Sequence, residues 1–364
     1  MRLIRPEIAS LCTYRVPDSR GMLKLDAMEN PYGWPEEMQA EWQQLLSSVA
    51  VNRYPDPYGK LVKARLREVM GVPDQMDIMI GNGSDELIQT IQLAVGGPGR
   101  AVLAPDPTFV MYAMIARMVG SPFVSVPLRE NFELDDTAMV SAIGNSAPTC
   151  LFIALPNNPT GNLFDLAGVE KIIGSTDALI VIDEAYHAFS GFTLLPRLAE
   201  FDNVVIMRTL SKSGLAGLRF GYLVGHSRWL HELEKVRLPY NVNTLTQVGV
   251  EFALRHSHIL DDQVQLLCDE RHRMQHELMK RAGVGVFPSH TNFLTFRIRT
   301  GSAKEVFDGL LDRRILIKRL EGERLAGCLR VTIGTKDQND TFLRALDKVL
   351  YELQIDLPGN DGCV

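Results

Sequence analysis

The chain has 364 residues, which is longer than one compact core usually grows, so we expect one large domain and a smaller one. A hydrophobic fraction of 46% and a charged fraction of 23% are ordinary for a globular protein and exclude a disordered or fibrous chain. The net charge of -6 disfavours a broad nucleic-acid surface, which needs a concentrated basic face, and favours small-molecule chemistry.

Three residue patterns bear on the cellular compartment of the protein and on whether it binds a metal. The five cysteines show no CxxC spacing, and their odd number favours reduced thiols over a disulfide framework. No segment reaches the roughly 18 apolar residues of a membrane span, and the N-terminus lacks the apolar stretch of a signal sequence. The eight histidines form no HExxH or other close ligand pair. We therefore expect a cytoplasmic enzyme without a metal site.

From about Lys60 to Val224, short apolar runs alternate with helical patterns, which predicts strand and helix units around a mostly parallel sheet. The runs are aliphatic or β-branched and bounded by Gly, Pro or Asn, as expected for strands that helices cover on both faces. They are DIMIG (77–81), RAVLAP (100–105), CLFIALP (150–156), ALIVIDE (178–184), NVVIMRTLS (203–211) and FGYLVG (220–225).

The pattern changes after Gly225. A periodic stretch from about Thr244 to Arg281 is typical of a helix, and three later apolar segments with a final helix predict a smaller α+β unit. These segments are TNFLTFRI, RRILIKRL and CLRVTIG, followed by the helix DTFLRALDKVLYELQ. We predict an N-terminal arm (1–28), a large ligand-binding domain (29–270) and a small C-terminal domain (271–364).

Open parallel sheets bind ligands beyond the carboxyl ends of their strands, so the residues that follow each run are the candidate site. The segments that follow the strands are Gly81–Glu86, Asp106–Tyr112, Pro156–Gly161, Asp183–His187 and Thr209–Arg219.

Taken singly, two of these segments have ordinary structural explanations. GNGSDE can hold a phosphate near Ser84 and Asp85 at a helix start, but a glycine-rich turn capped by Ser84 explains the same residues. NNPTG can be a turn whose Asn side chains bond their own backbone.

Asp183 is harder to explain as an ordinary structural residue, because burying an unpaired carboxylate at the end of an apolar strand costs free energy. Asp183 and Tyr186 could address one flat heterocycle, with the carboxylate toward a ring N–H and the phenol toward a ring oxygen. We interpret their neighbours Glu184 and His187 as surface residues or as residues behind the site.

Lys212 has two interpretations. A lone lysine near an apolar run is most often a surface residue whose stem covers the core. Beside the hydroxyls of Thr209 and Ser211, and with Arg219 to neutralise a phosphate, it is instead arranged as a Schiff-base nucleophile. A lysine, a carboxyl, a phenol, an aromatic face and a phosphate cup together suit pyridoxal 5'-phosphate.

At this point the whole pattern resembles the fold-type I pyridoxal-phosphate aminotransferases, and within them the histidinol-phosphate aminotransferase family. The resemblance covers nearly the whole chain and depends on the order and spacing of several motifs. These are LDAMENPYG (25–33), NRYPDPYG (52–59), GNGSDE (81–86), PDPTFVMY (105–112), PNNPTG (156–161), DEAY (183–186), TLSKSGLAGLR (209–219), RLPYNVN (237–243) and GCLRVTIGT (327–335).

The resemblance implies a role for each residue around the cofactor ring. Lys212 would form the Schiff base, Asp183 would pair with the ring nitrogen, and Asn158 and Tyr186 would bond the ring oxygen. Phe109 would stack on the ring; many relatives carry tyrosine there, so stacking is kept and a hydroxyl contact is lost.

The resemblance also implies the phosphate ligands and a partner. Tyr54 would reach the phosphate from the other subunit, so a homodimer with shared active sites is expected. The ligands from the same subunit would be Ser84 and Asp85 through their backbone, and Thr209, Ser211 and Arg219 through their side chains.

For the substrate, the resemblance implies that Arg330 receives the phosphate of histidinol phosphate or a carboxylate of the glutamate pair. Tyr14 and Asn30 would line the same side, and either Lys318 or Arg319 would add a basic group. For these four residues an ordinary structural role is an equal alternative.

The implied reaction is transamination of L-histidinol phosphate with 2-oxoglutarate in histidine biosynthesis. The alternatives are an aromatic or broad-specificity aminotransferase and a threonine-phosphate decarboxylase. A non-catalytic regulatory module is disfavoured because Lys212, Asp183, Asn158 and Tyr186 are all present. A dinucleotide-binding dehydrogenase is excluded because no predicted strand is followed by GxGxxG.

Overall fold

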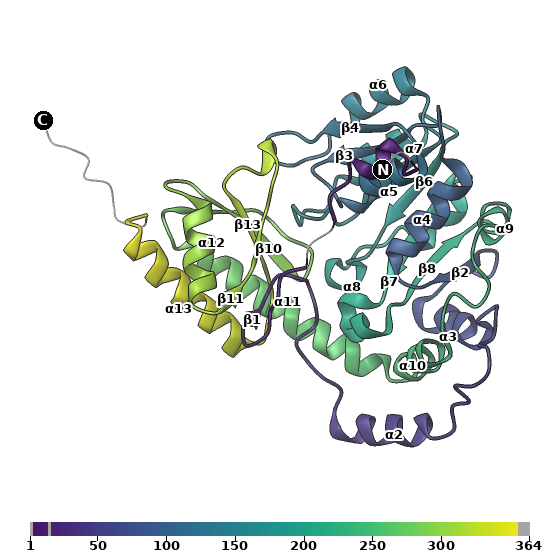
Figure 1. Cartoon of the computed structure of the whole chain (residues 1–364), viewed down its shortest axis with the longest axis horizontal. Helices are drawn as coiled ribbons and strands as arrows, with labels where there is room; N and C mark the ends of the chain where they lie inside the picture. Colours follow the sequence, from purple (N-terminus) through teal and green to yellow (C-terminus); the bar gives the residue numbers. More distant parts are fainter. Residues whose placement is uncertain (1–2, 14–15, 356–364) are drawn as a thin grey trace, which may run out of the picture.

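A computed structural model of the chain describes residues 3–13 and 16–355, and the structural statements below concern these residues. Figure 1 shows a large lobe built on a seven-stranded sheet and a small lobe built on a four-stranded sheet. The predicted fold, a mostly parallel sheet flanked by helices with a second, smaller α+β unit, is therefore confirmed.

The large sheet has the strand order β2–β8–β7–β6–β5–β3–β4. Only β8 runs antiparallel to its neighbours in this sheet, so the other six strands share one direction and end at one edge. The strands are β2 (Asp77–Gly81), β3 (Val102–Asp106), β4 (Phe123–Pro127), β5 (Cys150–Ala154), β6 (Leu179–Asp183), β7 (Val204–Thr209) and β8 (Gly221–Gly225).

Helices cover both faces of this sheet, which explains why its strands are continuously apolar. On β6, Ile180 and Ile182 join one hydrophobic core while Leu179 and Val181 join another, because successive side chains of a strand point to opposite faces. The first face packs against α3 (Lys60–Met70), α6 (Asp136–Ser146), α7 (Leu166–Ile173) and α10 (Thr244–Arg255), and the second against α4 (Ser84–Val95), α5 (Met111–Val119) and α9 (Ser227–Glu234).

The small lobe is an antiparallel sheet in the order β12–β13–β10–β9 with two helices beside it. Its strands are β9 (Val284–Val286), β10 (Phe293–Ile298), β12 (Lys318–Arg319) and β13 (Cys328–Thr332), and its helices are α12 (Ala303–Asp312) and α13 (Lys336–Glu352). At the start of α13, Thr335 and Gln338 form a reciprocal capping box.

The end of the predicted N-terminal arm, residues 23–28, is bound into the small lobe. β1 (Leu23–Lys24) pairs in parallel with β11 (Ile315–Leu316), and the amide of Thr332 donates to the carbonyl of Leu25 at 2.8 Å. The amide of Met28 then donates to Oγ1 of Thr332 at 2.9 Å. The residues after β1 are thereby held against β13.

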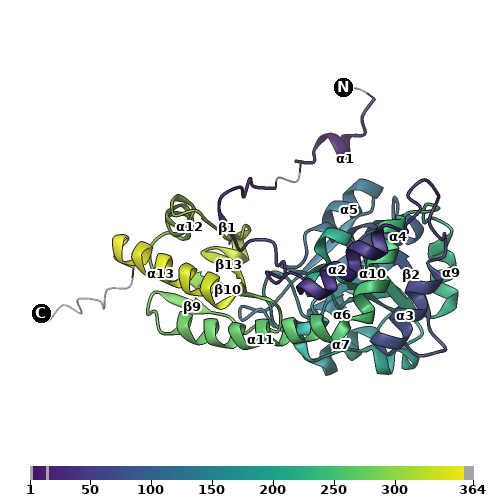
Figure 2. The ribbon, with the colours of Figure 1, turned by 90° about the horizontal axis from the view of Figure 1, so that it is seen from below.

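The long helical stretch predicted from about Thr244 to Arg281 is two helices. α10 ends at Arg255, His256 has non-helical backbone angles, and α11 (Ser257–Met279) begins immediately afterwards. Figure 2 shows α11 running from the large lobe into the small one. The division at residues 28 and 270 stays a prediction, and α11 passes through the second boundary unbroken.

The remaining described elements are short or peripheral. They are α1 (Pro6–Ala9), α2 (Glu36–Leu46), α8 (His187–Ser190), the 3-10 helices η1 (Leu195–Glu200), η3 (Ala216–Leu218) and η4 (Glu323–Leu325), and the π-helical turn η2 (Ser211–Leu215). Within residues 3–13 and 16–355, no helix combines the length and the apolar character that crossing a membrane requires.

Candidate active site

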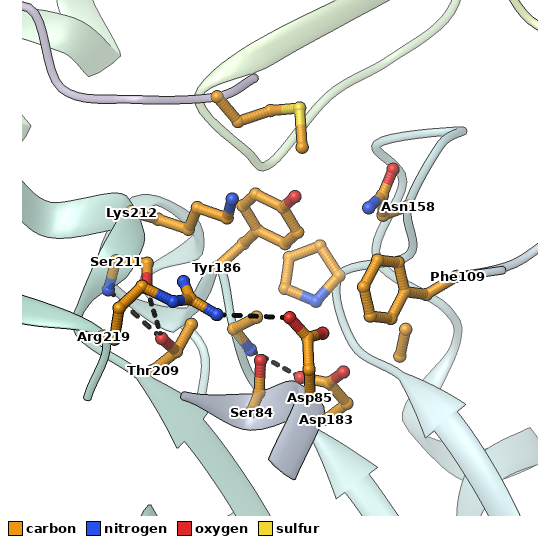
Figure 3. A pocket seen from close by; sticks show the side chains of 14 residues that line it. Ser84, Asp85, Phe109, Asn158, Asp183, Tyr186, Thr209, Ser211, Lys212 and Arg219 are labelled. Carbon is orange, nitrogen blue, oxygen red and sulfur yellow. Dashed lines mark hydrogen bonds and ion pairs between the residues drawn. The ribbon is translucent and has the colours of Figure 1, made fainter. Parts of the chain in front are cut away.

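A pocket lies at the edge of the large sheet where the parallel strands end (Figure 3). Met28, Ala154, Pro156 and Ala185 contribute to its wall. The residues predicted to hold a cofactor that line it are Ser84, Asp85, Phe109, Asn158, Asp183, Tyr186, Thr209, Ser211, Lys212 and Arg219. The structure thus brings together side chains from five different strand ends.

One end of the pocket is built to receive an anion. α4 begins at Ser84 without a capping side chain, so its first N–H groups remain available at the positive end of the helix dipole. Gly83 has φ +87°, and a Cβ there would come within 2.8 Å of an Arg219 nitrogen, so glycine lets this guanidinium approach. Arg219 also pairs with Asp85 at 3.2 Å.

Lys212 lies on the turn η2 directly after β7, and its Nζ donates to the carbonyl of Ala27 at 3.4 Å. Desolvation lowers the pKa of its ammonium to about 8, and the charges of Arg330 and Arg219 act in the same direction. A larger fraction of Lys212 is therefore a neutral amine at neutral pH than for an exposed lysine, as a nucleophile or proton acceptor requires.

Asp183 ends β6 and is 5% exposed. Its Oδ2 accepts a hydrogen bond from the Tyr112 hydroxyl at 2.5 Å, and its Oδ1 accepts from the amide of Ala185 at 3.0 Å. Burial raises its pKa to about 6, while these two hydrogen bonds oppose the rise. The carboxyl is mostly ionised at neutral pH and has only neutral hydrogen-bond donors beside it.

Asn158 and Tyr186 lie on the side of the pocket toward the small lobe. Oδ1 of Asn158 accepts from Nη1 of Arg330 at 2.6 Å, and the Arg330 guanidinium lies 5.2 Å from the centre of the Phe293 ring. Burial raises the pKa of Tyr186, so its hydroxyl stays protonated and can donate a hydrogen bond at neutral pH. Arg330 therefore reaches the pocket wall through Asn158.

The sequence left Lys318 and Arg319 as equal alternatives, and strand register distinguishes them. Lys318 lies opposite Arg330 across the antiparallel pair β12–β13, so both side chains are on one face of the small sheet. Arg319 is on the other face, is exposed, and pairs with Glu321 at 3.1 Å. The register favours Lys318 as the basic neighbour of Arg330.

Two further predicted residues, Tyr54 and Asn30, do not line this pocket in the described part of the chain. Tyr54 is 80% exposed and stacks on Tyr240 with a ring separation of 4.4 Å. The Asn30 amide donates to Oε1 of Gln263 at 2.9 Å, beside the turn that carries Lys212. Tyr14 lies outside the described residues.

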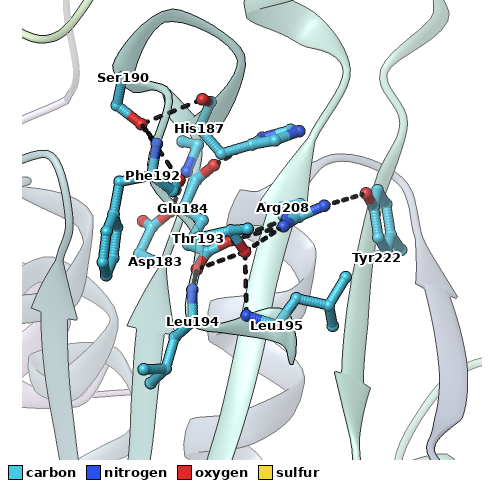
Figure 4. Close-up of polar contacts among 11 residues, drawn as sticks. Asp183, Glu184, His187, Ser190, Phe192, Thr193, Leu194, Leu195, Arg208 and Tyr222 are labelled. Carbon is cyan, nitrogen blue, oxygen red and sulfur yellow. Dashed lines mark hydrogen bonds and ion pairs between the residues drawn. The ribbon is translucent and has the colours of Figure 1, made fainter. Parts of the chain in front are cut away.

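Glu184 belongs to a buried network behind the pocket, so of its two interpretations the second is confirmed and the surface position is wrong (Figure 4). Its side chain is 0% exposed and forms an ion pair with Arg208 at 2.7 Å. It also accepts from Thr193 and from the amide of Leu194. Burial, followed by the charge of Arg208, lowers the pKa of the neighbouring His187 to about 3, so that ring stays neutral.

The sequence interpretation missed Tyr112, which lies behind the pocket, and Met28, which lines its wall. Tyr112 lies in the first turn of α5, within the motif PDPTFVMY, and no local pattern in the sequence links it to Asp183. Met28 lies within LDAMENPYG, but nothing in that pattern shows that it lines the pocket. No group of three or more His, Cys, Asp or Glu residues in the described chain is arranged to hold a metal ion.

The fold and the pocket define an α/β protein that gathers a lysine, a buried carboxylate, an aromatic ring and an open helix start at the carboxyl edge of its sheet. Residues 20–346 match the model of the class I and II aminotransferases. The chain belongs to this family.

Curated relatives extend the match over nearly the whole chain. The histidinol-phosphate aminotransferase 2 of Nitrosococcus oceani is 51% identical over 345 residues, covering 94% of this chain and 96% of the relative. The histidinol-phosphate aminotransferase 2 of Cupriavidus pinatubonensis is 47% identical over 358 residues, covering 96% and 97%.

Solved structures agree on the fold. The histidinol-phosphate aminotransferase of Sinorhizobium meliloti in complex with pyridoxal-5'-phosphate superposes with a TM-score of 0.88 at 24% identity, covering 97% of this chain and 99% of that one. The L-threonine-O-3-phosphate decarboxylase of Porphyromonas gingivalis superposes with a TM-score of 0.76 at 22% identity, covering 90% and 99%. Fold alone therefore does not separate transamination from decarboxylation.

Proposed function

We propose that the protein is a pyridoxal-phosphate-dependent aminotransferase of histidine biosynthesis. It transfers the amino group of L-histidinol phosphate to 2-oxoglutarate and gives imidazole acetol phosphate and L-glutamate. The observation that carries this proposal is the 51% identity, over 94% of the chain, to a relative named for this substrate. The pocket supplies the groups that the reaction needs.

The described residues fit pyridoxal 5'-phosphate group by group. The start of α4, the hydroxyls of Thr209 and Ser211 and the Arg219 guanidinium suit its phosphate. Asp183 suits the ring nitrogen, and Phe109 offers an aromatic face. When bound, this cofactor supplies an electron-accepting ring that stabilises negative charge on the amino-bearing carbon of the substrate.

Lys212 is the proposed catalytic base and acid. Its amine would hold the cofactor through the cofactor aldehyde, and as a free amine it would take the proton from the amino-bearing carbon of the substrate and later return a proton. Its pKa of about 8 keeps part of the population neutral at neutral pH, so the group can act in both directions. The turn η2 fixes the amine at the end of β7.

Asp183, Asn158 and Tyr186 orient the ring in this proposal. The Asp183 carboxylate holds a proton on the ring nitrogen, while the Asn158 amide and the Tyr186 hydroxyl donate to the ring oxygen. The Oδ1 atom of Asn158 already accepts from Arg330, which leaves its NH₂ group as the donor for the ligand. The hydrogen bond therefore fixes the orientation of the Asn158 amide.

Arg330 is the proposed receptor for the far end of the substrate. A guanidinium can bind a phosphate or a carboxylate through the same paired N–H groups, so one residue can serve histidinol phosphate and 2-oxoglutarate in turn. Lys318, on the same face of the small sheet, adds a second positive charge that favours the doubly charged phosphate.

We also propose a homodimer in which Tyr54 of one subunit completes the pocket of the other. Large hydrophobic side chains are exposed in two segments, 54–61 and 236–245, which meet where Tyr54 stacks on Tyr240. Such exposure supports an interface. We place the enzyme in the cytoplasm; the free state of Cys12, Cys150, Cys268 and Cys328 is compatible with a reducing compartment.

The test is a comparison of kcat/KM for L-histidinol phosphate with the values for L-phenylalanine and L-tyrosine, each with 2-oxoglutarate as acceptor. We expect a preference of at least about 100-fold for the phosphorylated amine, because Arg330 and Lys318 would pair with its phosphate. A preference for the aromatic amino acids would refute the proposal. Release of carbon dioxide from O-phosphothreonine without 2-oxoglutarate would instead identify a decarboxylase.

A further inference from the structure

We propose that Tyr112 is a positioning residue that holds the Asp183 carboxylate in the orientation and the ionised state that the cofactor ring requires. The inference rests on the proposed role of Asp183. The Tyr112 hydroxyl donates to Oδ2 of Asp183 at 2.5 Å, and the tyrosine is 0% exposed. A fully buried hydroxyl has few alternatives to this acceptor.

Tyr112 is itself held through its hydroxyl, its backbone carbonyl and its ring. Its ring stacks on Phe152 with centres 4.6 Å apart and an angle of 14° between the planes. Phe109 contacts it edge-on at 5.6 Å, and the Tyr112 carbonyl accepts from the buried Gln92 amide at 3.1 Å. The hydroxyl therefore cannot swing away from Asp183 without disturbing a packed core.

The two hydrogen bonds of Asp183 leave room for a ligand. An ionised carboxylate has about four acceptor positions on its two oxygens. Tyr112 uses one on Oδ2 and the amide of Ala185 uses one on Oδ1. Both donors approach from within the fold, and Asp183 still lines the pocket. The carboxylate is thus fixed from behind while acceptor positions remain for a ring N–H.

The charges around Asp183 show why a donor is needed there. Burial raises its pKa, and the carboxylates of Asp85 and Glu184 raise it further. The Tyr112 hydroxyl and the Ala185 amide favour the ionised form and oppose this rise. Without the hydroxyl, Asp183 becomes partly protonated at neutral pH and loses the negative charge that keeps a proton on the ring nitrogen.

The test uses Tyr112→Phe, which removes the hydroxyl and keeps the ring that stacks on Phe152. The dissociation constant of pyridoxal 5'-phosphate is measured with the cofactor-free protein, by tryptophan fluorescence, at pH 7.0 and pH 8.5. We expect binding about tenfold weaker at pH 7.0, because a hydrogen bond to a charged group is lost. The difference in dissociation constant between the variant and the wild type should be smaller at pH 8.5, where Asp183 is ionised in both.

Tyr222→Phe is the matched control. Tyr222 is also 0% exposed, but its hydroxyl lies 3.5 Å from a nitrogen of Arg208 and does not bond Asp183. We expect this variant to bind the cofactor within about twofold of wild type at both pH values, since the loss of a buried hydroxyl far from the ligand affects stability rather than binding. A loss equal to that of Tyr112→Phe would overturn the inference.

A second measurement needs no cofactor. With its pKa raised to about 6, Asp183 binds a proton more tightly in the folded protein than in the unfolded chain. Its contribution to the free energy of unfolding is therefore complete below the pKa of the unfolded chain and is lost as the pH rises through 6. In Tyr112→Phe the pKa of Asp183 is higher, so this loss of stability extends to a higher pH. A series of thermal unfolding midpoints from pH 4 to pH 8 measures it. Asp183→Asn should abolish this component in both backgrounds.

Two results would overturn the inference: unchanged cofactor affinity in Tyr112→Phe, or an equal weakening at both pH values with no change in the pH profile of unfolding. The second would show that Tyr112 acts through packing alone. Neither measurement involves a substrate, so the proposed reaction stands or fails separately. Wild-type protein that binds no pyridoxal 5'-phosphate would instead refute the proposed function.

Discussion

Asp183 and Glu184 are adjacent acids at the end of one strand, and the fold uses them in opposite ways. Asp183 faces the pocket with only neutral donors, Tyr112 and Ala185, on its carboxylate. Glu184 is buried behind the pocket in an ion pair with Arg208 at 2.7 Å. A carboxylate with no cation beside it keeps its charge available for a ligand, whereas a paired one holds the structure together.

Two buried arginines lie in these two layers, Arg208 behind the pocket and Arg330 at its wall. Both guanidinium groups of Arg208 and Arg330 are buried, but Arg208 pairs with the protein's own carboxylate while Arg330 donates to an amide oxygen and a carbonyl. Arg330 is thus held at the pocket by Asn158 and by the carbonyl of Asp26. We expect substitutions of Asp183 and Arg330, at the pocket, to lower catalysis. Substitutions of Glu184, which lies behind the pocket, should instead lower stability.

Within this comparison of the two acids and the two arginines, the largest effect is expected for Asp183→Asn, which keeps the shape of the side chain and removes its charge. Turnover should fall about 10²–10³-fold, because the charge that stabilises the protonated ring is lost. Steady-state kinetics with saturating cofactor measure this loss. Asp136→Asn, at a surface pair with Lys171, is the control and should leave turnover unchanged. Wild-type turnover in Asp183→Asn would remove Asp183 from the mechanism.

Glu184→Gln tests the other side of the comparison. Removing one charge of a buried pair leaves Arg208 uncompensated, and we expect the free energy of unfolding to fall by about 3 kcal/mol. Urea unfolding measures the change, and turnover per folded molecule should stay within a few-fold of wild type. Glu200→Gln, at an exposed pair with Arg197, should change neither. A stable but inactive Glu184→Gln protein would reverse the assignment.

Arg330→Lys should lower kcat/KM about 100-fold for both L-histidinol phosphate and 2-oxoglutarate, because a lysine cannot reproduce the paired N–H groups. Lys318→Met should weaken mainly the phosphorylated substrate, since it removes a nearby charge rather than the fork. The ratio of the two kcat/KM values distinguishes these cases. An Arg319→Met variant that matched Lys318→Met would contradict the register argument.

The smallest effect concerns stability and pH. Because ionised Asp183 is costly to bury, cofactor-free Asp183→Asn should be more stable than wild type above pH 6, by about 2–4 °C in unfolding midpoint. The difference should shrink as the pH falls from 6 toward 4, where the wild-type carboxyl becomes protonated. Thermal scans across this range measure it. A difference that grows toward low pH would contradict the raised pKa.

Much of the large lobe could be predicted from local pattern. The apolar runs bounded by Gly, Pro and Asn coincide with β2, β3, β5, β6, β7 and β8, because helices cover both faces of this sheet. The reversed direction of β8 was not predictable, since a fully buried strand reads the same in either direction. The break at His256 was also missed, because both flanking helices share one apolar periodicity.

What escaped prediction depends on contacts between distant residues. The bond from Tyr112 to Asp183 spans 71 positions, and the contact of Met28 with Thr332 spans 304. No local pattern encodes such contacts. The choice between Lys318 and Arg319 likewise needed the register of β12 against β13. Motifs could assemble the list of residues that line the pocket, while the support behind Asp183 required the structure.

The most direct test of the account is Lys212→Ala, studied with cofactor and both substrates. Because Lys212 is proposed both to link the cofactor and to move the proton, the variant should lose the visible absorbance of the lysine-linked cofactor and should form no L-glutamate from L-histidinol phosphate and 2-oxoglutarate. Wild type should show both. Retention of turnover in Lys212→Ala would contradict the central claim.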